Sequence, residues 1–161
     1  MVLEKQLFLF LNIVHSSMKQ LLSDSFRNGG FKLSPEQFLV MDTLWDEGVL
    51  TQQQIADITM RDKNSIVKLI DGLESRKLVR RVSNPDDRRQ NLIKVTPYSL
   101  KIKGEVEALA YESVYRIIGD ISRDELKLFV KVLAMMERNI NPASDLEALA
   151  EKYPTKKKCN G

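Results

Sequence analysis

Apolar residues recur at spacings of three and four at both ends of the chain, and this spacing predicts long helices. The first segment, residues 3–27, is apolar around most of its first half, so more than one side must be covered. The last segment, residues 98–140, is expected to hold two helices. The first runs to about Gly119, and the second begins after Ser122, with Glu125 three residues later as its capping partner, and ends at Asn141-Pro142. The two ends therefore carry more apolar surface than the middle of the chain can bury.

Two helix starts between these segments carry the same capping signature. Ser34 is followed by Pro35 and then, three residues after the serine, by Gln37; Thr51 is followed by Gln54 at the same spacing. A serine or threonine with a glutamine three residues later satisfies amide groups at a helix start. We therefore expect one helix that begins after Ser34 and a second, short helix that begins after Thr51.

The pattern after the short helix predicts a reading module. Residues 60–62 form a turn, residues 63–77 a longer helix, and residues 78–82 and 92–95 two strands. A short helix, a three-residue turn and a longer helix make the helix-turn-helix arrangement. The two strands that follow make a β-hairpin with its turn at residues 84–87.

Charge is concentrated on this module, although the net charge of +3 is too small to indicate a partner. Residues 51–96 hold ten lysines and arginines against six acidic residues, whereas the rest of the chain holds fifteen against sixteen. A surplus of positive charge there is what a phosphate-binding surface requires.

Composition and motif content argue against several other classes. With 43% hydrophobic and 29% charged residues the chain is globular, and it has no apolar run of about 18 residues that could span a membrane. The single cysteine, Cys159, fits a reducing cytoplasm. Neither a glycine-rich phosphate loop nor a set of nucleophile, histidine and acid is suggested by any local motif. We therefore expect a cytoplasmic protein that is not an enzyme and has no cofactor or metal.

The longer helix presents a polar and basic face once Ile66, Leu69, Ile70 and Leu73 are assigned to the core. Asparagine can pair with adenine, lysine with guanine or phosphate, and valine methyls can touch thymine, while free amides at the helix start can bind phosphate. The alternative is the solvated face of an ordinary helix. The residues predicted to contact the major groove are Lys63, Asn64, Ser65, Val67 and Lys68.

The hairpin turn carries more charges than such short strands need, in the sequence Asp86-Asp87-Arg88-Arg89-Gln90. An exposed arginine on a projecting loop can enter the narrow minor groove. A neighbouring aspartate such as Asp87 can orient it through a charge-assisted hydrogen bond. The alternative is a solvated turn whose local ion pairs contribute little.

These motifs resemble those of the MarR family, the multiple-antibiotic-resistance-type winged-helix regulators. The family wing has Asp-x-Arg followed by Leu-Thr-x-x-Gly. Asp87-Arg88-Arg89 matches the first part, whereas Val95-Thr96-Pro97-Tyr98-Ser99 has valine for leucine and serine for glycine. The segment 73–79 resembles the family pattern at the helix end, with Lys77 where glycine is usual. The resemblance covers nearly the whole chain.

The resemblance implies a mainly α fold over residues 1–142. It consists of a winged helix-turn-helix (about 34–96) with a small β-hairpin wing, flanked by N- and C-terminal dimerisation helices (about 3–27 and 98–140). Residues 143–161 are expected to be a partly disordered tail. The family forms homodimers with interleaved first and last helices, and the unpartnered apolar stripes at both chain ends agree with this.

The resemblance also implies functional roles for individual residues. Arg89, with Arg88 beside it, would enter the minor groove, and Asp87 would brace the wing. A dimer would place two reading helices in successive major grooves about 34 Å apart and favour a palindromic site. We therefore expect a bacterial-type, sequence-specific regulator of transcription that binds double-stranded DNA, most simply a repressor. The alternative is a winged-helix protein-interaction module, against which the basic helix face and the wing arginines argue.

Family members often bind small aromatic or anionic effectors between the dimer helices and the winged core. An effector could therefore release this chain from DNA. For each residue that might line such a pocket the simpler interpretation, which we favour, is ordinary core. The candidates are His15, Met18, Phe38, Met41, Trp45 and Tyr111.

Overall fold

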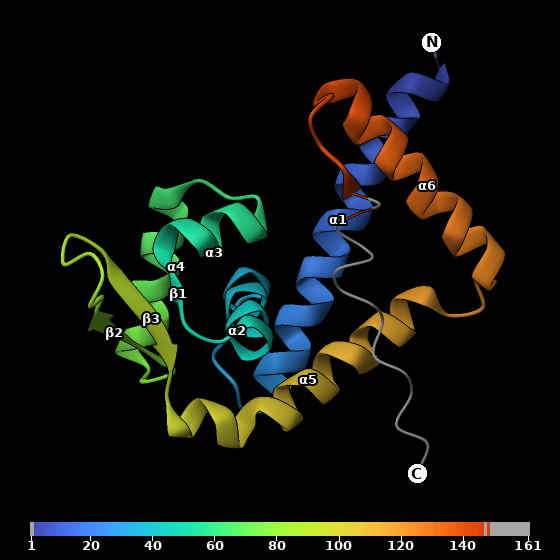
Figure 1. Ribbon diagram of the computed structural model, residues 1–161. Helices are drawn as coiled ribbons and strands as arrows, with labels where there is room; N and C mark the ends of the chain where they lie inside the picture. Colours follow the sequence, from blue (N-terminus) through green and yellow to red (C-terminus); the bar gives the residue numbers. More distant parts are fainter. Residues whose placement is uncertain (1, 147, 149–161) are drawn as a thin grey trace. The chain divides into compact units, whose positions relative to one another are not determined.

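The computed structural model describes residues 2–146 and 148, so most of the predicted tail at 143–161, including Cys159, lies outside the described residues (Figure 1). The chain divides into two compact units, residues 1–117 and 118–161. The domain boundaries expected from the sequence, 1–142 and 143–161, stay a prediction.

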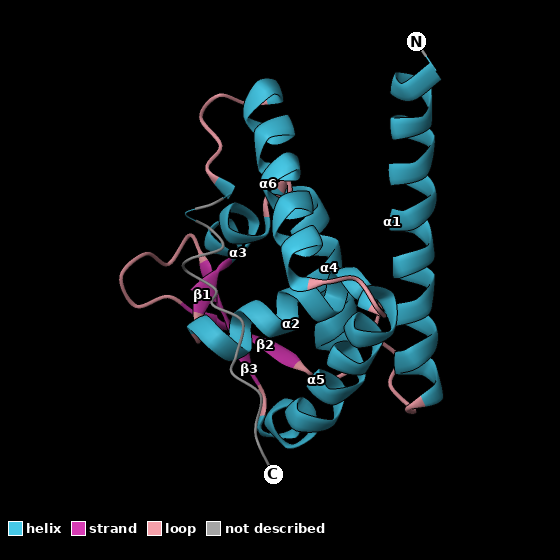
Figure 2. Ribbon diagram, turned by 90° about the vertical axis from the view of Figure 1, so that its right-hand side faces the viewer, coloured by secondary structure: helices cyan, strands magenta, loops and turns pink. Residues whose placement is uncertain are grey.

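The first unit contains the predicted helices and hairpin in the predicted order, which confirms a mainly α winged helix-turn-helix. Figure 1 shows α2, α3 and α4 packed beside a small sheet, and Figure 2 shows that sheet in magenta. The elements are α1 (Val2–Asn28), α2 (Pro35–Glu47), β1 (Leu50–Thr51), α3 (Gln52–Thr59), α4 (Lys63–Ser75), β2 (Val79–Ser83), β3 (Asn91–Val95) and α5 (Pro97–Ile118).

The sheet has three antiparallel strands in the order β1-β3-β2. β2 and β3 form the expected hairpin, in register from Val79 opposite Val95 to Ser83 opposite Asn91. The third strand, β1, was not predicted, because two residues are too short to show a period of two. It pairs Leu50 with Ile93 and thereby ties the start of α3 to the base of the wing.

The helix starts form as their capping signatures predict. The Ser34 hydroxyl accepts a hydrogen bond from the Gln37 amide at 3.1 Å, and the Gln37 side chain accepts one from the Ser34 amide at 3.2 Å. Thr51 and Gln54 repeat this arrangement at 3.2 and 2.8 Å. Each capping box fixes where its helix begins and so sets the position of the residues that follow.

Two departures from the family pattern have a structural counterpart. Lys77 adopts a φ of +60°, the left-handed conformation that glycine takes most easily at a helix end. Ser99 is fully buried, and its hydroxyl accepts a hydrogen bond from the Trp45 indole N–H at 2.9 Å. Thr96 links the two sites, because its hydroxyl donates to the Lys77 carbonyl and accepts from the Ser99 amide. The helix end and the start of α5 are therefore joined by hydrogen bonds.

The two halves of α1 differ sharply in burial within the first unit. Near its C-terminal end, Phe26 is fully buried and its ring lies 5.2 Å from that of Phe38 on α2. Before residue 20 almost every side chain is exposed, and Phe8 is 83% exposed. The exposed large apolar side chains of this part are Leu3, Leu7, Phe8, Leu9, Phe10, Ile13, Val14 and Met18.

The second unit consists mainly of α6 (Arg123–Ile140). It begins with the capping box expected from Ser122 and Glu125 and ends at Asn141, as predicted. Within this unit only Ala134 is buried among the described residues, and Phe129 and Val130 are about half exposed. Among the helices described in either unit, none combines the length and the apolar character that crossing a membrane would require.

Candidate nucleic-acid interface

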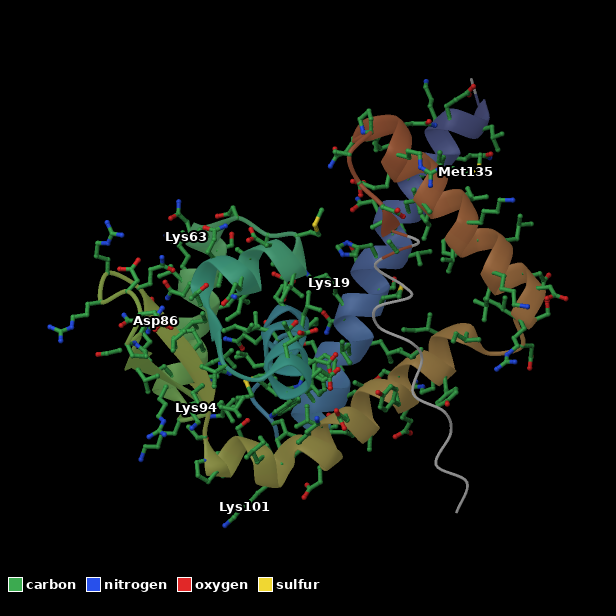
Figure 3. The ribbon with its side chains drawn as sticks, viewed as in Figure 1. Lys19, Lys63, Asp86, Lys94, Lys101 and Met135 are labelled. Atoms are coloured by element: carbon green, nitrogen blue, oxygen red, sulfur yellow. The ribbon has the colours of Figure 1, made fainter. Side chains whose placement is uncertain are left out.

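Helix α4 is fixed on one side by the core and open on the other. Ile66, Ile70 and Leu73 are fully buried, as predicted from their spacing. The predicted contact residues lie on the remaining surface of the helix, and Figure 3 labels Lys63 at its N-terminal end. Lys63, Asn64 and Lys68 are exposed, whereas Ser65 and Val67 are half-buried. The backbone beneath the contact residues is therefore held by packing rather than by the contacts themselves.

Asp62 caps the front of α4, a role that the sequence analysis did not assign. Its carboxylate accepts hydrogen bonds from the Ser65 amide at 2.9 Å and from the Ser65 hydroxyl at 2.5 Å. These hydrogen bonds, the one from the hydroxyl first, hold the pKa of Asp62 below its ordinary value. The Ser65 amide is therefore already occupied and is not one of the helix-start amides left free to bind phosphate. The spacing of Asp62 and Ser65 is itself a helix-start signal that would have found this cap.

Arg81 joins the wing to α4 and was also missed. Its guanidinium pairs with the carboxylates of Glu74 and, at 2.6 Å, of Asp71. Its backbone amide donates to Glu74 at 2.8 Å. The side chain is 23% exposed, so these charge-assisted hydrogen bonds are partly shielded from water. They fix β2 against the C-terminal half of α4.

The wing turn is organised around Asp87. Its carboxylate accepts hydrogen bonds from the amide and the Nε of Arg89, both at 3.0 Å, and from the Gln90 side chain, also at 3.0 Å. These interactions, led by the Arg89 side chain, lower the pKa of Asp87. The Arg89 side chain is nevertheless 90% exposed. The turn therefore orients the guanidinium through its ion pair with Asp87 and still leaves the side chain exposed to solvent.

Several cations of this surface have no ion partner. In the part of the chain that the structure describes, Lys63, Lys68 and Arg88 form no ion pair and are exposed. Charge that is left unneutralised at the front of α4 and at the tip of the wing is suited to an anionic partner.

The six candidate effector residues occupy different environments. Met41 is fully buried, Phe38 stacks near Phe26, and Trp45 bonds Ser99 and lies 5.9 Å from the Lys103 ammonium. Core packing thus accounts for the three candidates on α2. The others, His15, Met18 and Tyr111, are exposed.

Two shallow hollows lie elsewhere on the first unit. One of about 310 Å³ is formed between α1 and α5 around Ser25, Leu109 and Arg116, and one of about 330 Å³ lies beside Lys19 and Pro35. None of the six candidate effector residues lines either hollow.

Comparison with known proteins shows what the fold and the central segment of the chain are similar to. The family model described as "MarR family" matches residues 33–90, which hold the helix-turn-helix and the wing turn. The HTH-type transcriptional regulator MhqR of Bacillus subtilis (strain 168) is 24% identical over 134 residues, which cover 83% of this chain and 91% of that protein.

Solved structures agree. A mutant of MarR from E. coli complexed with operator DNA matches with a TM-score of 0.74 and 20% identity, over 81% of this chain and 92% of that one. BpsR of Bordetella bronchiseptica, solved in work on the regulation of its DNA binding by 6-hydroxynicotinic acid, matches with a TM-score of 0.73 and 23% identity, over 84% and 92%. With the arrangement of α3, α4 and the wing, these matches show that the chain has the winged helix-turn-helix fold of the MarR-type regulators and that its residues 33–90 match the MarR family model.

Proposed function

We propose that the chain represses transcription by binding a palindromic operator in double-stranded DNA as a homodimer. The observation that carries the proposal is the set of unneutralised cations at the front of α4 and at the wing tip, on two rigidly connected elements. The complex of E. coli MarR with operator DNA supports DNA as the partner.

In this proposal α4 enters the major groove with Lys63, Asn64, Ser65, Val67 and Lys68. Their chemistry differs. Lys68 can donate to guanine or phosphate, and Asn64 can pair with adenine. The Ser65 hydroxyl already donates its proton to Asp62, so towards a base it can only accept. It would therefore favour a base that presents an amino group, adenine or cytosine.

The wing tip provides the second contact set. Asp87 braces the turn and orients Arg89, whose guanidinium reaches into the minor groove, with Arg88 beside it. Negative potential is strongest where the minor groove is narrow, so this contact would favour A·T-rich flanks. The shape of the groove, more than hydrogen bonding to a base, would then be read by the wing.

A second copy of the chain is the partner that we propose for the exposed apolar helices. α1 leaves eight large apolar side chains exposed, and α6 leaves Phe129 and Val130 about half exposed. Apolar surface of this extent is unfavourable in water. A two-fold interface would cover it and place two α4 helices about 34 Å apart, the spacing of successive major grooves.

Release by a small aromatic or anionic effector is the regulatory part of the proposal. The support comes from BpsR, a protein of similar fold whose DNA binding is regulated by 6-hydroxynicotinic acid. The exposed members of the candidate set are His15, Met18 and Tyr111. Met18 belongs to the α1 surface that the second copy would cover, so an effector that binds there would bind at the dimer interface.

Selection of bound fragments from a random DNA pool tests the proposed function. We expect enrichment of a palindrome whose half-sites are centred about one helical turn apart. No enrichment, together with binding that is equal for all sequences or absent, would contradict the proposal and favour a protein-interaction module. Light scattering at micromolar concentration should give the mass of a dimer, and a stable monomer would contradict the two-fold arrangement.

A further inference from the structure

The outer face of the wing carries two cations directly opposite each other. Arg80 on β2 faces Lys94 on β3 in the antiparallel register, and both side chains are exposed. Like charges in this position repel and destabilise a hairpin. On the same face of the sheet the next pair along, Val82 opposite Leu92, is apolar and offers no counter-charge. The hairpin therefore carries an electrostatic cost with no benefit to its own folding.

The inner face of the same hairpin is treated differently. Arg81, the neighbour of Arg80, is neutralised by Asp71 and Glu74. Neither Arg80 nor Lys94 forms an ion pair within the described residues 2–146. Carboxylates thus pair with Arg81, the cation that joins β2 to α4, but not with Arg80 and Lys94, which face outwards. This distribution is the one expected if an external anion faces the outer pair.

The position of the pair indicates which anion. Arg80 and Lys94 lie three register steps below the last pair of the hairpin, Ser83 and Asn91, which is about 10 Å at roughly 3.4 Å per residue. The turn beyond that pair carries Arg89. The minor groove of B-DNA is about 7.5 Å deep and about 6 Å wide, with phosphates along both rims. A wing whose tip enters the groove therefore keeps its stem just outside the groove, where the long side chains of Arg80 and Lys94 can reach the phosphates along its rim.

We propose that Arg80 and Lys94 form a phosphate-binding pair on the outer face of the wing, which holds the sugar-phosphate strand at the outer edge of the DNA site. The inference rests on the proposed DNA binding and adds a third contact set to α4 and the wing tip. A phosphate contact carries no sequence information. Its role is to hold the wing at the depth at which Arg89 reaches the groove. An acidic protein segment is the competing partner, but it would have no reason to lie on the hairpin that carries the exposed tip arginines.

The test uses the full chain and one duplex taken from the random-pool selection, shortened stepwise from both ends. The variant is the double substitution Arg80→Gln/Lys94→Gln. On long duplexes we expect a weaker dependence of log affinity on log salt, by about 0.9 per lost phosphate contact and so about 1.8 per wing. On the shortest duplex that keeps both major-groove half-sites but ends before the outer strand, we expect the double variant to bind as tightly as the wild type does.

Two matched variants separate contact from net charge and from folding. Lys32→Gln/Lys101→Gln removes the same charge from exposed positions outside the wing, α1 and α6, and should keep the wild-type salt dependence on every duplex. Arg80→Lys/Lys94→Arg keeps both charges on the wing and should bind as the wild type does. Because the double glutamine substitution removes a repulsive pair, its thermal unfolding midpoint should not fall below that of the wild type.

Three results would overturn the inference. The first is an unchanged salt dependence of Arg80→Gln/Lys94→Gln on long duplexes. The second is an equal loss of affinity on long and short duplexes, which would mean that the pair does not contact the strand at the outer edge of the site. The third is an equal change in the Lys32→Gln/Lys101→Gln control, which would show that the effect comes from net charge alone. If the wild type itself binds no duplex, the proposed function fails along with the inference. This outcome is seen in the wild-type titration alone, so it cannot be confused with a failure of the Arg80 and Lys94 contacts.

Discussion

The front of α4 and the tip of the wing are both exposed and basic, but they are held in place by different means. α4 rests on three fully buried side chains, Ile66, Ile70 and Leu73, and its first turn is capped by Asp62. The wing turn has no comparable core, and hydrogen bonds from its own neighbours to Asp87 organise it. One contact set is therefore fixed by tertiary packing and the other by local polar interactions.

This difference matches what each groove demands. Reading base edges in the major groove requires donors and acceptors at fixed positions, which a packed helix provides. The minor groove offers a degenerate hydrogen-bonding pattern, and its width and electrostatic potential matter more, so an exposed cation at the tip of a short turn is sufficient. Substitutions should therefore affect sequence preference through α4 and affinity through the wing.

Arg81→Ala should have the largest effect, because Arg81 connects the two regions. It leaves the carboxylates of Asp71 and Glu74 without their cation, and hydrogen bonds to charged groups of this kind contribute about 2 kcal/mol to the free energy of unfolding. DNA binding should weaken as well, because the wing loses its position relative to α4. The measurement is urea unfolding together with DNA titration. Arg80→Ala, on the outer face of the same strand, should change the unfolding free energy by less than about 0.5 kcal/mol. Equal losses of unfolding free energy in both variants would contradict the role of Arg81 in connecting the wing to α4.

Lys68→Ala should have the next largest effect, about 1–2 kcal/mol of binding free energy per half-site if the ammonium contacts a base. Titration against the selected duplex and against duplexes with single changes in each half-site distinguishes two outcomes. If Lys68 contacts a base, the preference for one base should weaken at one position of the half-site. A loss that is uniform across all duplexes would show a phosphate contact instead. Lys101→Ala, at an exposed position on α5, is the matched loss of one lysine and should leave preference unchanged.

Arg89→Ala should weaken binding by less than Lys68→Ala does and lower the salt dependence by about one unit per wing. Sequence preference within the half-sites should stay the same, because α4 is untouched. The matched control is Arg27→Ala, which removes an exposed arginine from α1. An affinity for the selected duplex equal to that of the wild type would exclude the wing arginine from the interface.

Asp62→Asn should have the smallest effect on stability and leave the urea unfolding midpoint where it is, because asparagine caps helices about as well as aspartate. The expected change is in preference. The amide nitrogen of the asparagine can donate a hydrogen bond to the Ser65 hydroxyl, which then keeps its own proton to donate to a base. The variant should therefore accept guanine or thymine where the wild type requires a base with an amino group. Selection from a random pool with both proteins measures this change. Identical selected sequences would mean that Asp62 acts only as a cap.

Local signals predicted most of the fold, because they act within a few residues. The capping pairs at Ser34, Thr51 and Ser122 placed three helix starts correctly, and the spacing of Ile66, Ile70 and Leu73 placed the buried face of α4. The strand β1 was missed, since two residues carry no periodicity and its partner Ile93 lies far along the chain.

The site was predicted less completely than the fold, because its contacts join residues that lie far apart in the sequence. Which side chains lie on the outer surface of α4 follows from its period, but their hydrogen-bonding state depends on neighbours. Arg81 and Asp71 are ten residues apart, and only the folded hairpin brings them together. Likewise, the like-charge pair of Arg80 and Lys94 appears only once the strand register is known. Tertiary pairing therefore carried the information that the sequence pattern lacked.

Hydroxyl-radical cleavage of the selected duplex, compared between the wild type and Arg89→Ala, tests the central claim of two separate contact sets most directly. The reagent reports access to the sugars along the groove edges. The wild type should protect an inner pair of patches beside the two α4 sites and an outer pair where the wings enter the minor groove. Arg89→Ala should lose the outer pair and keep the inner pair. Protection that weakens equally everywhere, or outer patches that persist, would contradict the account.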